Sequence, residues 1–294
     1  TPEGTSWGGS GVICKLKDMA KLAYICLNKG RWNDKQLISE EYITAATSKQ
    51  IDNSLSGRDG YGYQIWMEGK NGFAFRGMGS QLALCYPDKN LIFACISDTQ
   101  GSGATGEGIS DSFYEEIFNK IEDAPLPFDA EGNAKLQEKI KNLKILPQRG
   151  NLTSSYVEKI NGKWFTLNEN PMNITRMRFI FNGDEGIWEY ENATGHHELK
   201  FGIGKTVEGP FPEKHYFGEQ IRRLWGRCYN SLSSAAWVEE HKLNMLVYIT
   251  DIYLGTMKAT FAFKGNQISI FMTKVAEWFL DEYMGFAGGV MAEE

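Results

Sequence analysis

The stretch YGYQIWMEGKNGFAFRGMGSQLALCYPDKNLIFACISD, residues 61–98, decides the fold of the first part of the chain. Its pattern predicts four consecutive strands, at 61–67, 73–76, 81–86 and 91–96. Pro87-Asp88-Lys89-Asn90, between the last two, has the residues of a tight turn. The runs LALCY and LIFACI do not alternate, so neither face of this sheet can lie in water. We therefore expect helices on both faces.

The sequence on either side of the four strands predicts those helices from its hydrophobic period, and this period changes later in the chain. Apolar residues at helical spacing predict helices over 15–28, 39–49 and 107–121. A charged helix over 129–144 precedes Pro147 and Gly150 and is typical of a linker. Beyond it the period is two, with a hairpin around 177–190 and alternating strands at 243–249, 257–263 and 268–272. The second half is thus predicted to be an antiparallel sheet, closed or sandwiched.

The composition limits the possible partners and location. A net charge of -6 and a pI near 5.4 exclude a nucleic-acid binder, which needs clustered Lys and Arg. No apolar run is long enough to span a membrane, and the polar start Thr1-Pro2-Glu3-Gly4 is not a signal sequence. Five cysteines without a CxxC pair favour a reducing, cytoplasmic compartment. An extracytoplasmic location would require a leader upstream of Thr1.

Short motifs around the four strands carry a family resemblance. In order they are Trp7-Gly8-Gly9-Ser10-Gly11, Gly30-Arg31-Trp32-Asn33, Gly60-Tyr61-Gly62-Tyr63, and a Gly77-x-Gly79 strand end followed by Tyr86-Pro87-Asp88-Lys89. Over residues 5–122 this order resembles the C-terminal half of a class C β-lactamase or penicillin-binding-protein-like serine hydrolase. The second domain resembles the lipocalin-like β-barrel that some members carry, with Gly162-Lys163-Trp164 similar to the lipocalin Gly-x-Trp signature.

The resemblance implies chemistry whose central residues are missing. Members of the family acylate a serine in Ser-x-x-Lys with a β-lactam, peptide or ester carbonyl, and need no metal or cofactor. No lysine of this chain has a serine three positions earlier. The family's Tyr-x-Asn occurs only as Tyr190-Glu191-Asn192, within the hairpin of the second half. We expect both motifs upstream of Thr1, and we predict that this chain alone is inactive.

The third family motif lies on the strand that borders the active site, as Lys-Thr-Gly or His-x-Gly. The matching triplet here is Phe75-Arg76-Gly77, which has phenylalanine where the family has a polar group. Arg76 faces the site only if the register shifts by one residue, and that shift moves it to the other face of the sheet. We therefore expect Phe75 to pack and Arg76 to be solvated. The N–H of Met78 is the candidate oxyanion donor.

Two further patterns have simpler interpretations. Gly101-x-Gly103-x-x-Gly106 has the spacing of a dinucleotide-binding loop, but three residues separate it from the strand, so a flexible connection is favoured. His196-His197-Glu198 suggests a metal, but neighbouring residues of a strand point to opposite faces and no third ligand has suitable spacing. We predict no metal site.

These observations predict an α+β chain in three parts. Residues 1–122 form a partial β-lactamase/transpeptidase-like antiparallel sheet with flanking helices, 123–150 a linker with a helix, and 151–294 an all-β antiparallel barrel. The leading hypothesis is the C-terminal portion of a serine hydrolase that acts on a small acyl substrate or peptide. The alternative is a non-catalytic module whose barrel holds an apolar ligand or a protein partner. The aromatic residues that would either line a cavity or fill the core are Trp164, Phe165, Trp188, Tyr190, Trp225 and Trp237.

A partial sheet has consequences for association. Without strands beside it, a sheet edge and an apolar face would be open around Phe75, Leu82, Leu84 and Phe93. We therefore expect the chain to self-associate through this sheet or to bind a separate N-terminal half.

Overall fold

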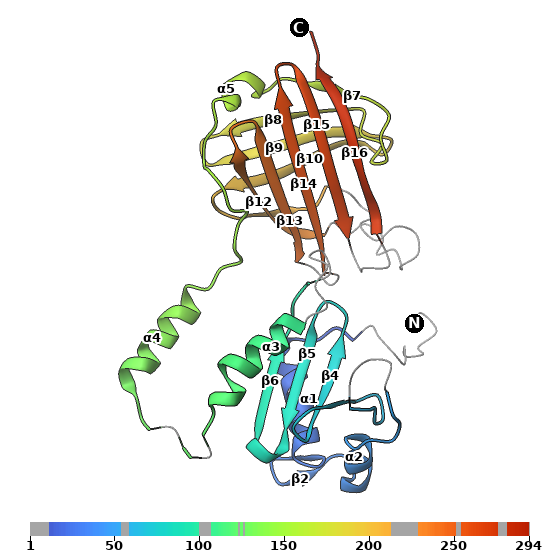
Figure 1. Cartoon of the computed structure of the whole chain (residues 1–294), viewed down its shortest axis with the longest axis vertical. Coiled ribbons are helices and arrows are strands. Elements are labelled where there is room, and N and C mark those ends of the chain that lie inside the picture. Colours follow the sequence, from blue (N-terminus) through green and yellow to red (C-terminus); the bar gives the residue numbers. More distant parts are fainter. Residues whose placement is uncertain are drawn as a thin grey trace. The chain divides into compact units, whose positions relative to one another are not determined.

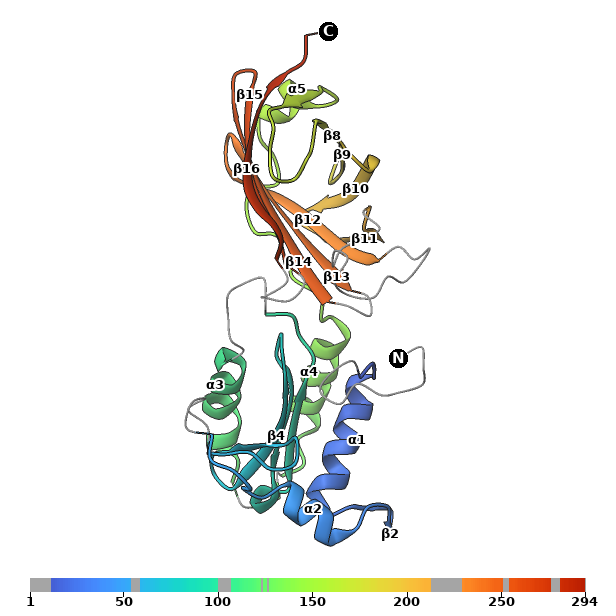
Figure 2. The ribbon, with the colours of Figure 1, turned by 90° about the vertical axis from the view of Figure 1, so that its right-hand side faces the viewer.

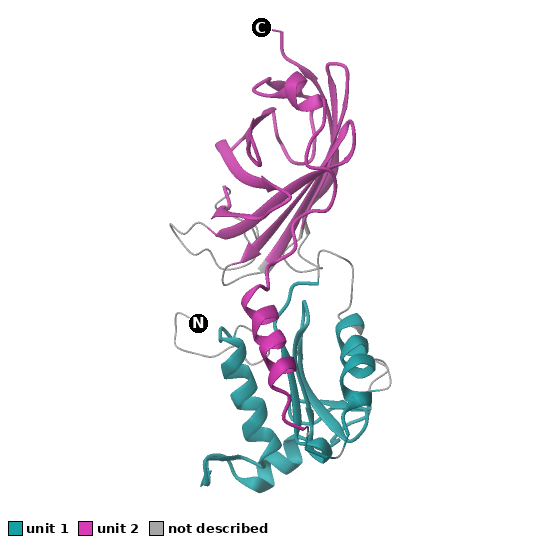
Figure 3. Ribbon diagram, turned by 90° about the vertical axis from the view of Figure 1, so that its left-hand side faces the viewer, with its two compact units in different colours: residues 1–99, 104–125 teal, residues 100–103, 126–294 magenta. Residues whose placement is uncertain are grey.

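The computed structural model describes residues 12–53, 59–99, 107–122, 124–125, 127–212, 229–250, 254–275 and 281–293. The glycine-rich segments around Gly9 and Gly103, and Trp225, lie outside these ranges. The chain divides into two compact units, residues 1–99 with 104–125, and residues 100–103 with 126–294 (Figure 3). The division into three parts at residues 122 and 150 stays a prediction.

The first unit is a four-stranded antiparallel sheet between helices. Its strands follow one another in sequence order as β3 (Trp66–Glu68), β4 (Gly72–Gly77), β5 (Gln81–Tyr86) and β6 (Leu91–Cys95). Its helices are α1 (Leu16–Leu27), α2 (Glu40–Ala46) and α3 (Glu107–Glu116), with 3-10 turns at Pro87–Lys89 and Phe118–Lys120 and a small ribbon of β1 (Arg31–Trp32) and β2 (Lys35–Gln36). The Ser39 side chain caps α2 by accepting from the Tyr42 N–H at 3.3 Å.

Both faces of this sheet are covered, as the unbroken apolar runs predict. On one face Phe73, Ala83 and Cys85 join a buried cluster with Ala23 and Cys26 of α1. On the other, a second cluster contains Ala74, Leu84, Tyr86, Phe113 and Phe118. Figure 2 shows α1 and α3 on opposite sides of β4. Successive residues of a strand thus enter different cores, so no position in the strand can be polar without a partner.

Two expectations about this sheet are corrected. The predicted strand over 61–67 is shorter, because Gln64 has a φ of 59° and turns the chain back, so that only Trp66–Glu68 form a strand. The apolar face is not open at Leu82 and Leu84, which are buried by the chain's own elements. Phe75 and Phe93 are only partly covered, and among the described residues β6 pairs with β5 alone.

The linker region contains α4 (Ala130–Lys141), capped by Asp129, which accepts from the Gly132 N–H at 2.8 Å. This helix has no buried residue. None of the helices in the described residues has the length and apolar composition to cross a membrane.

The second half is a sheet that closes on itself (Figure 1). A short helix, α5 (Tyr156–Ile160), precedes the strands. They are β7 (Phe165–Leu167), β8 (Arg176–Asn182), β9 (Glu185–Asn192), β10 (Gly195–Ile203), β11 (Val207–Pro210), β12 (Asn230–Glu239), β13 (Lys242–Thr250), β14 (Leu254–Lys264), β15 (Gln267–Val275) and β16 (Asp281–Met291). Their order is β10-β9-β8-β7-β16-β15-β14-β13-β12-β11. A parallel contact of β10 with β12, at Gly202–Ser234 and Ile203–Ala235, closes the ring.

The predicted hairpins of this half are confirmed. β8 and β9 pair from Asn182–Glu185 outward, and Gly183 in the turn has a φ of 62°. β14 and β15 pair from Lys264–Gln267 outward, with a φ of 61° at Gly265. Both glycines occupy the left-handed region that tight hairpins require. Residues from every one of these strands except β11 then enter one continuous core inside the barrel.

Candidate functional site

The residues of the predicted third motif lie at the end of β4 and in the turn that follows. Phe75 packs against the α1 cluster, as expected. The N–H of Met78, the predicted oxyanion donor, makes no backbone or side-chain hydrogen bond among the described residues, and the Met78 side chain is 46% exposed. Gly79 and Ser80 follow with φ of 73° and 70°, and Ser80 is buried. A buried serine in the left-handed region stores backbone strain, which is common at functional turns.

Each carbonyl group of this turn accepts a hydrogen bond from a neighbouring side chain. The Ser97 hydroxyl donates to the carbonyls of Gly79 and Ser80, at 2.9 and 3.2 Å. The Gln81 side-chain amide donates to the carbonyls of Met78 and Ser97, at 3.1 and 2.6 Å. The turn is therefore rigid, with its oxygens occupied and the Met78 N–H available.

Arg76 is not solvated, contrary to expectation. Its guanidinium and the Glu68 carboxylate are joined by three contacts of 2.7 to 3.0 Å, and the two side chains are only 12% and 9% exposed. The Ser110 hydroxyl of α3 lies 3.4 Å from Arg76 Nη1. Register explains the difference, because Arg76 points to the α3 face of the sheet, opposite Phe75, and that face is covered.

A pair of tyrosines extends this buried ion pair into the sheet. The Tyr114 hydroxyl donates to Glu68 Oε1 at 2.9 Å and lies 2.5 Å from the Tyr86 hydroxyl. Burial raises the pKa of Tyr114 to about 12, and burial also raises the pKa of Tyr86. Both phenols are thus neutral at ordinary pH. The network fixes α3 to the strands.

The Tyr190-Glu191-Asn192 triplet, which the sequence analysis did not take as the family's second motif, lies at the end of β9. Tyr190 is buried inside the barrel, while Glu191 faces outward and forms an ion pair with Arg176 at 2.6 Å. That guanidinium lowers the pKa of Glu191 by hydrogen bonding. Tyr190 and Glu191 therefore serve different faces of one strand.

The interior of the barrel is a second candidate site. Four of the predicted aromatic residues, Phe165, Trp188, Tyr190 and Trp237, are at most 2% exposed and lie in the barrel core. Trp164 is instead on the outside, where the guanidinium groups of Arg176 and Arg178 lie 4.5 and 4.7 Å from its ring. The buried aromatic side chains thus belong to the inner face of the barrel, and Trp164 belongs to the outer face.

Polar side chains interrupt this core. Ser231 and Ser233 alternate along β12 with Ala235 and Trp237, which are core residues, so the serines share the inner face. Ser231 donates to the Gly209 carbonyl at 3.1 Å, whereas the Ser233 hydroxyl and the Trp188 Nε1 have no hydrogen-bond partner among the described residues. Lys274, 1% exposed, shares the inner face of β15 with Met272, and its amine lies 5.7 Å from the Phe211 ring.

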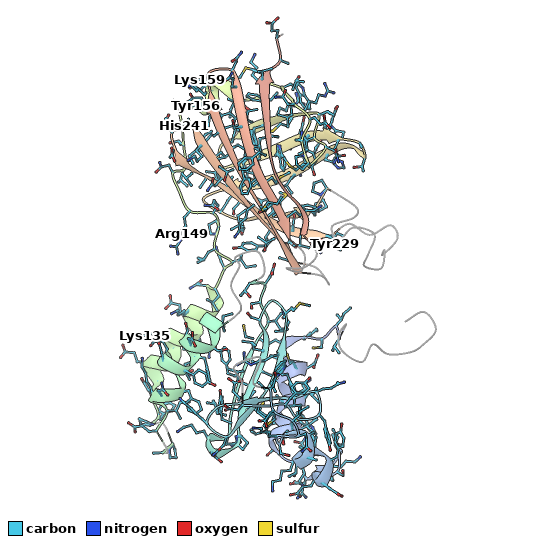
Figure 4. The ribbon with its side chains drawn as sticks, turned by 45° about the vertical axis from the view of Figure 1, so that its right-hand side comes forward. Lys135, Arg149, Tyr156, Lys159, Tyr229 and His241 are labelled. Atoms are coloured by element: carbon cyan, nitrogen blue, oxygen red, sulfur yellow. The ribbon has the colours of Figure 1, made fainter. Side chains whose placement is uncertain are left out.

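Two hollows lie on the barrel surface. One of about 500 Å³ lies beside α5 and includes Tyr156 and His241, which Figure 4 labels at one end of the barrel. The other, of about 360 Å³, lies along residues 167–175 with Asn192 and Ala193. Both are open to solvent, and neither is lined by a residue of the predicted third motif.

The sequence analysis missed a possible metal-ligand group. Glu189, His196 and Glu198 have ligand atoms within 4.8 Å of one another. The third ligand comes from across the hairpin, because Glu198 pairs with Glu189 in the β9–β10 ladder. The signal in the sequence was the hairpin itself, because a short turn after Asn192 places Glu198 opposite Glu189 on the neighbouring strand. Glu189 is, however, already bound to Arg178 at 2.5 Å, and His197 points inward and stacks on Tyr190, so the group carries no metal assignment.

No protein-family model and no curated protein matches the sequence. Solved structures similar to part of the chain include the fatty-acid-binding protein of Manduca sexta. It is 10% identical, the match covers 45% of this chain and 98% of that protein, and the TM-score is 0.31. Lipid binding protein 8 of Caenorhabditis elegans has 11% identity, with 48% and 99% covered and a TM-score of 0.32. The fatty acid-binding protein of Drosophila melanogaster brain has 12% identity, with 45% and 98% covered and a TM-score of 0.31. The assignment of a barrel rests on the strand pairing of this chain.

Proposed function

We propose that the barrel of this chain is a binding module for a small, largely apolar molecule that carries a hydrogen-bond acceptor. The observation that carries the proposal is the pair of buried polar atoms on the inner face, Trp188 Nε1 and Ser233 Oγ, which have no hydrogen-bond partner in the described part of the chain. A buried donor without a partner costs about 1–3 kcal/mol, so such atoms need an explanation in a native core. An acceptor on a ligand, such as a carbonyl or carboxylate oxygen, would remove that cost.

The surroundings of Trp188 define the rest of such a ligand. The Tyr190 and Phe261 rings lie 4.5 and 5.4 Å from the Trp188 ring, between ring centroids. An indole N–H only donates, so a ligand group that also only donates, such as an ammonium, would not satisfy it. The site therefore suits an apolar body with an oxygen acceptor.

Binding is tested by titrating the full chain with dodecanoate and dodecanol and following tryptophan fluorescence. Trp188→Phe and Ser233→Ala should each weaken binding about tenfold, the loss expected for one hydrogen bond of about 1.4 kcal/mol. Without ligand, each variant should lose only the stability that comes from its missing packing contacts. No further loss is expected, because neither substitution removes a hydrogen bond within the protein. Ser231→Ala is the matched control, since it loses the bond to Gly209 and should destabilise the free protein.

The result that overturns the proposal is equally specific. If neither probe binds, or if Ser233→Ala and Ser231→Ala destabilise the free protein equally, the two polar atoms are not held for a ligand.

A second candidate function concerns the first unit, as the C-terminal portion of an acyl-serine hydrolase of the β-lactamase and penicillin-binding class. The turn after β4 favours it, because side chains hold its carbonyl groups while the Met78 N–H makes no hydrogen bond among the described residues, as an oxyanion donor requires. Without Ser-x-x-Lys the chain has no nucleophile of this type. Incubation with a fluorescent penicillin, followed by intact-mass analysis, should therefore give no covalent adduct, and an adduct on any serine would contradict this assignment.

A further inference from the structure

The apolar side chains of α4 and its flanks are exposed. Phe128, Leu136, Ile140 and Leu143 are each more than half exposed, and the helix has no buried residue. Leu136, Ile140 and Leu143 follow the spacing i, i+4, i+7 and share one face. Leu143 continues this face beyond the last residue of α4, because its N–H donates to the Ile140 carbonyl at 3.3 Å. A helix of 12 residues without packing is marginally stable in water, so this apolar stripe needs a cover.

The charges of the segment are distributed unevenly around and along the helix. Residues 139–149 contain four cations and no carboxylate, in a chain whose net charge is -6. Lys139 lies about 60° around the helix from Leu136, whereas Glu138 lies about 160° away. Glu131 is on the same far side of the helix as Glu138. The apolar stripe is therefore bordered by positive charge, and the acidic side chains point away from it.

We propose that α4 docks on the surface of an anionic lipid bilayer and lies in the plane of the interface. Helices of this type bury their apolar stripe at the boundary between head groups and acyl chains, while lysine stems run along the apolar side and place the amines at lipid phosphates. Each cation near such a surface strengthens binding about fivefold. The inference does not depend on a ligand inside the barrel. The docking surface consists of Phe128, Leu136, Lys139, Ile140, Leu143 and Lys144.

Charge and size favour a lipid surface over other partners. A nucleic acid would bind the cations through its phosphates but would leave the apolar stripe in water. A stable protein interface uses about 20–30 residues on each side, far more than this stripe presents. An anionic bilayer accepts both the narrow stripe and the cations beside it, because it is apolar inside and negatively charged at its surface.

The first test is flotation of the full chain with vesicles. The wild type should float with vesicles of phosphatidylglycerol and phosphatidylcholine, and not with vesicles of phosphatidylcholine alone. Raising the salt from about 0.1 M to about 1 M should release most of the bound protein, because salt screens the attraction. A wild type that does not float with the anionic vesicles overturns the proposal, and so does equal flotation with both kinds.

Substitutions of lysine test the charge. Lys139→Gln together with Lys144→Gln should weaken binding to the anionic vesicles about 30-fold, since two cations are lost. Lys17→Gln together with Lys200→Gln is the matched control, because it removes the same charge at exposed positions elsewhere in the chain. The control should bind like the wild type. Equal behaviour of the two double variants overturns the proposal.

Substitutions of apolar residues separate the helix from the barrel. Leu136→Gln together with Ile140→Gln should lose binding to the vesicles, and both positions are exposed, so the variant should fold. Trp188→Phe, inside the barrel, should bind the vesicles like the wild type. If Trp188→Phe loses binding and the α4 variant does not, lipid enters the barrel instead, and the docking of α4 is wrong.

Hydrogen exchange locates the contact. With anionic vesicles the amides of α4 should exchange more slowly, while those of β14 in the barrel should not change. Protection elsewhere without protection of α4 contradicts the proposal. Poly-glutamate is the second probe. If it slows exchange in α4 and the vesicles do not, the occupant is an acidic peptide, and the assignment of a lipid surface is wrong.

Discussion

Strands β6 and β13 show that an apolar sequence does not decide burial. Every residue of β6 is apolar, yet each one is only half-buried, because the strand is at an edge of an open sheet. β13 has polar residues at alternate positions, yet its inner side chains Leu243, Met245, Val247 and Ile249 are at most 1% exposed. Closure of the barrel, and not hydrophobicity, makes the difference, since a closed ring gives each strand two neighbours and one dry face.

The largest effect expected from this comparison is in the barrel core. Phe261→Ala removes a fully buried ring that contacts Phe179 and Trp188, and should cost the barrel about 3–5 kcal/mol. Denaturant unfolding followed by tryptophan fluorescence and circular dichroism measures it. Phe271→Ala, on the outer face, should cost much less. Similar losses for the two would show that the inner and outer faces are not energetically distinct.

A smaller effect is expected from the ion pair of the first unit. Glu68→Gln leaves the Arg76 charge buried without its partner and should destabilise that unit by about 3 kcal/mol. The exposed pair between Arg176 and Glu191 on the barrel is the matched control, and Glu191→Gln should change stability little. Hydrogen exchange of α3 and of β8 separates the two responses. An unchanged α3 in Glu68→Gln would mean that water replaces the carboxylate.

The boundary of the barrel gives a third prediction. The Gln148 N–H donates to Ser234 Oγ at 2.9 Å, and Asn151 and Trp237 exchange two backbone hydrogen bonds. A fragment of residues 146–294 should therefore fold cooperatively. Its free energy of unfolding should be about 1–3 kcal/mol higher than that of the 152–294 fragment, which lacks these hydrogen bonds. Thermal melts of the two fragments measure the difference. If neither fragment folds, the barrel depends on the first unit.

The smallest effect is a dependence on alkaline pH in the first unit. The folded pKa of Tyr114, about 12, exceeds the usual value of 10, so folding favours the neutral phenol. The resulting stability is complete below pH 10 and is lost as the pH rises toward 12. In a pH titration followed by ultraviolet absorbance, the wild type should show one more phenol than Tyr114→Phe, and this phenol should ionise above pH 10. If the phenol that the variant lacks instead ionises near pH 10 in the wild type, the α3 face is open to water.

Particular residues show how far sequence reasoning extends to the site. Phe75 and Met78 were assigned from the family's third motif, counted from the glycines of the turn, and their role in a site stays a prediction. Arg76 was misjudged because its partner Glu68 lies eight residues away on another strand, and its cover, α3, is 31 residues further on. The Ser233 hydroxyl, which has no partner among the described residues, leaves no local trace in the sequence, because its burial depends on which strands become neighbours.

The sequence by itself determined the elements of this protein. Apolar periods set the strands of both halves, glycines at positive φ set their hairpins, and the absence of Ser-x-x-Lys excluded a nucleophile of that type. Only the tertiary structure decided that the second sheet closes through β10 and β12, and that the Trp188 and Ser233 side chains are buried without a hydrogen-bond partner among the residues that the structure describes. The physical reason is that periods and turns act over a few residues, whereas closure, burial and edge pairing depend on contacts between segments far apart in the chain.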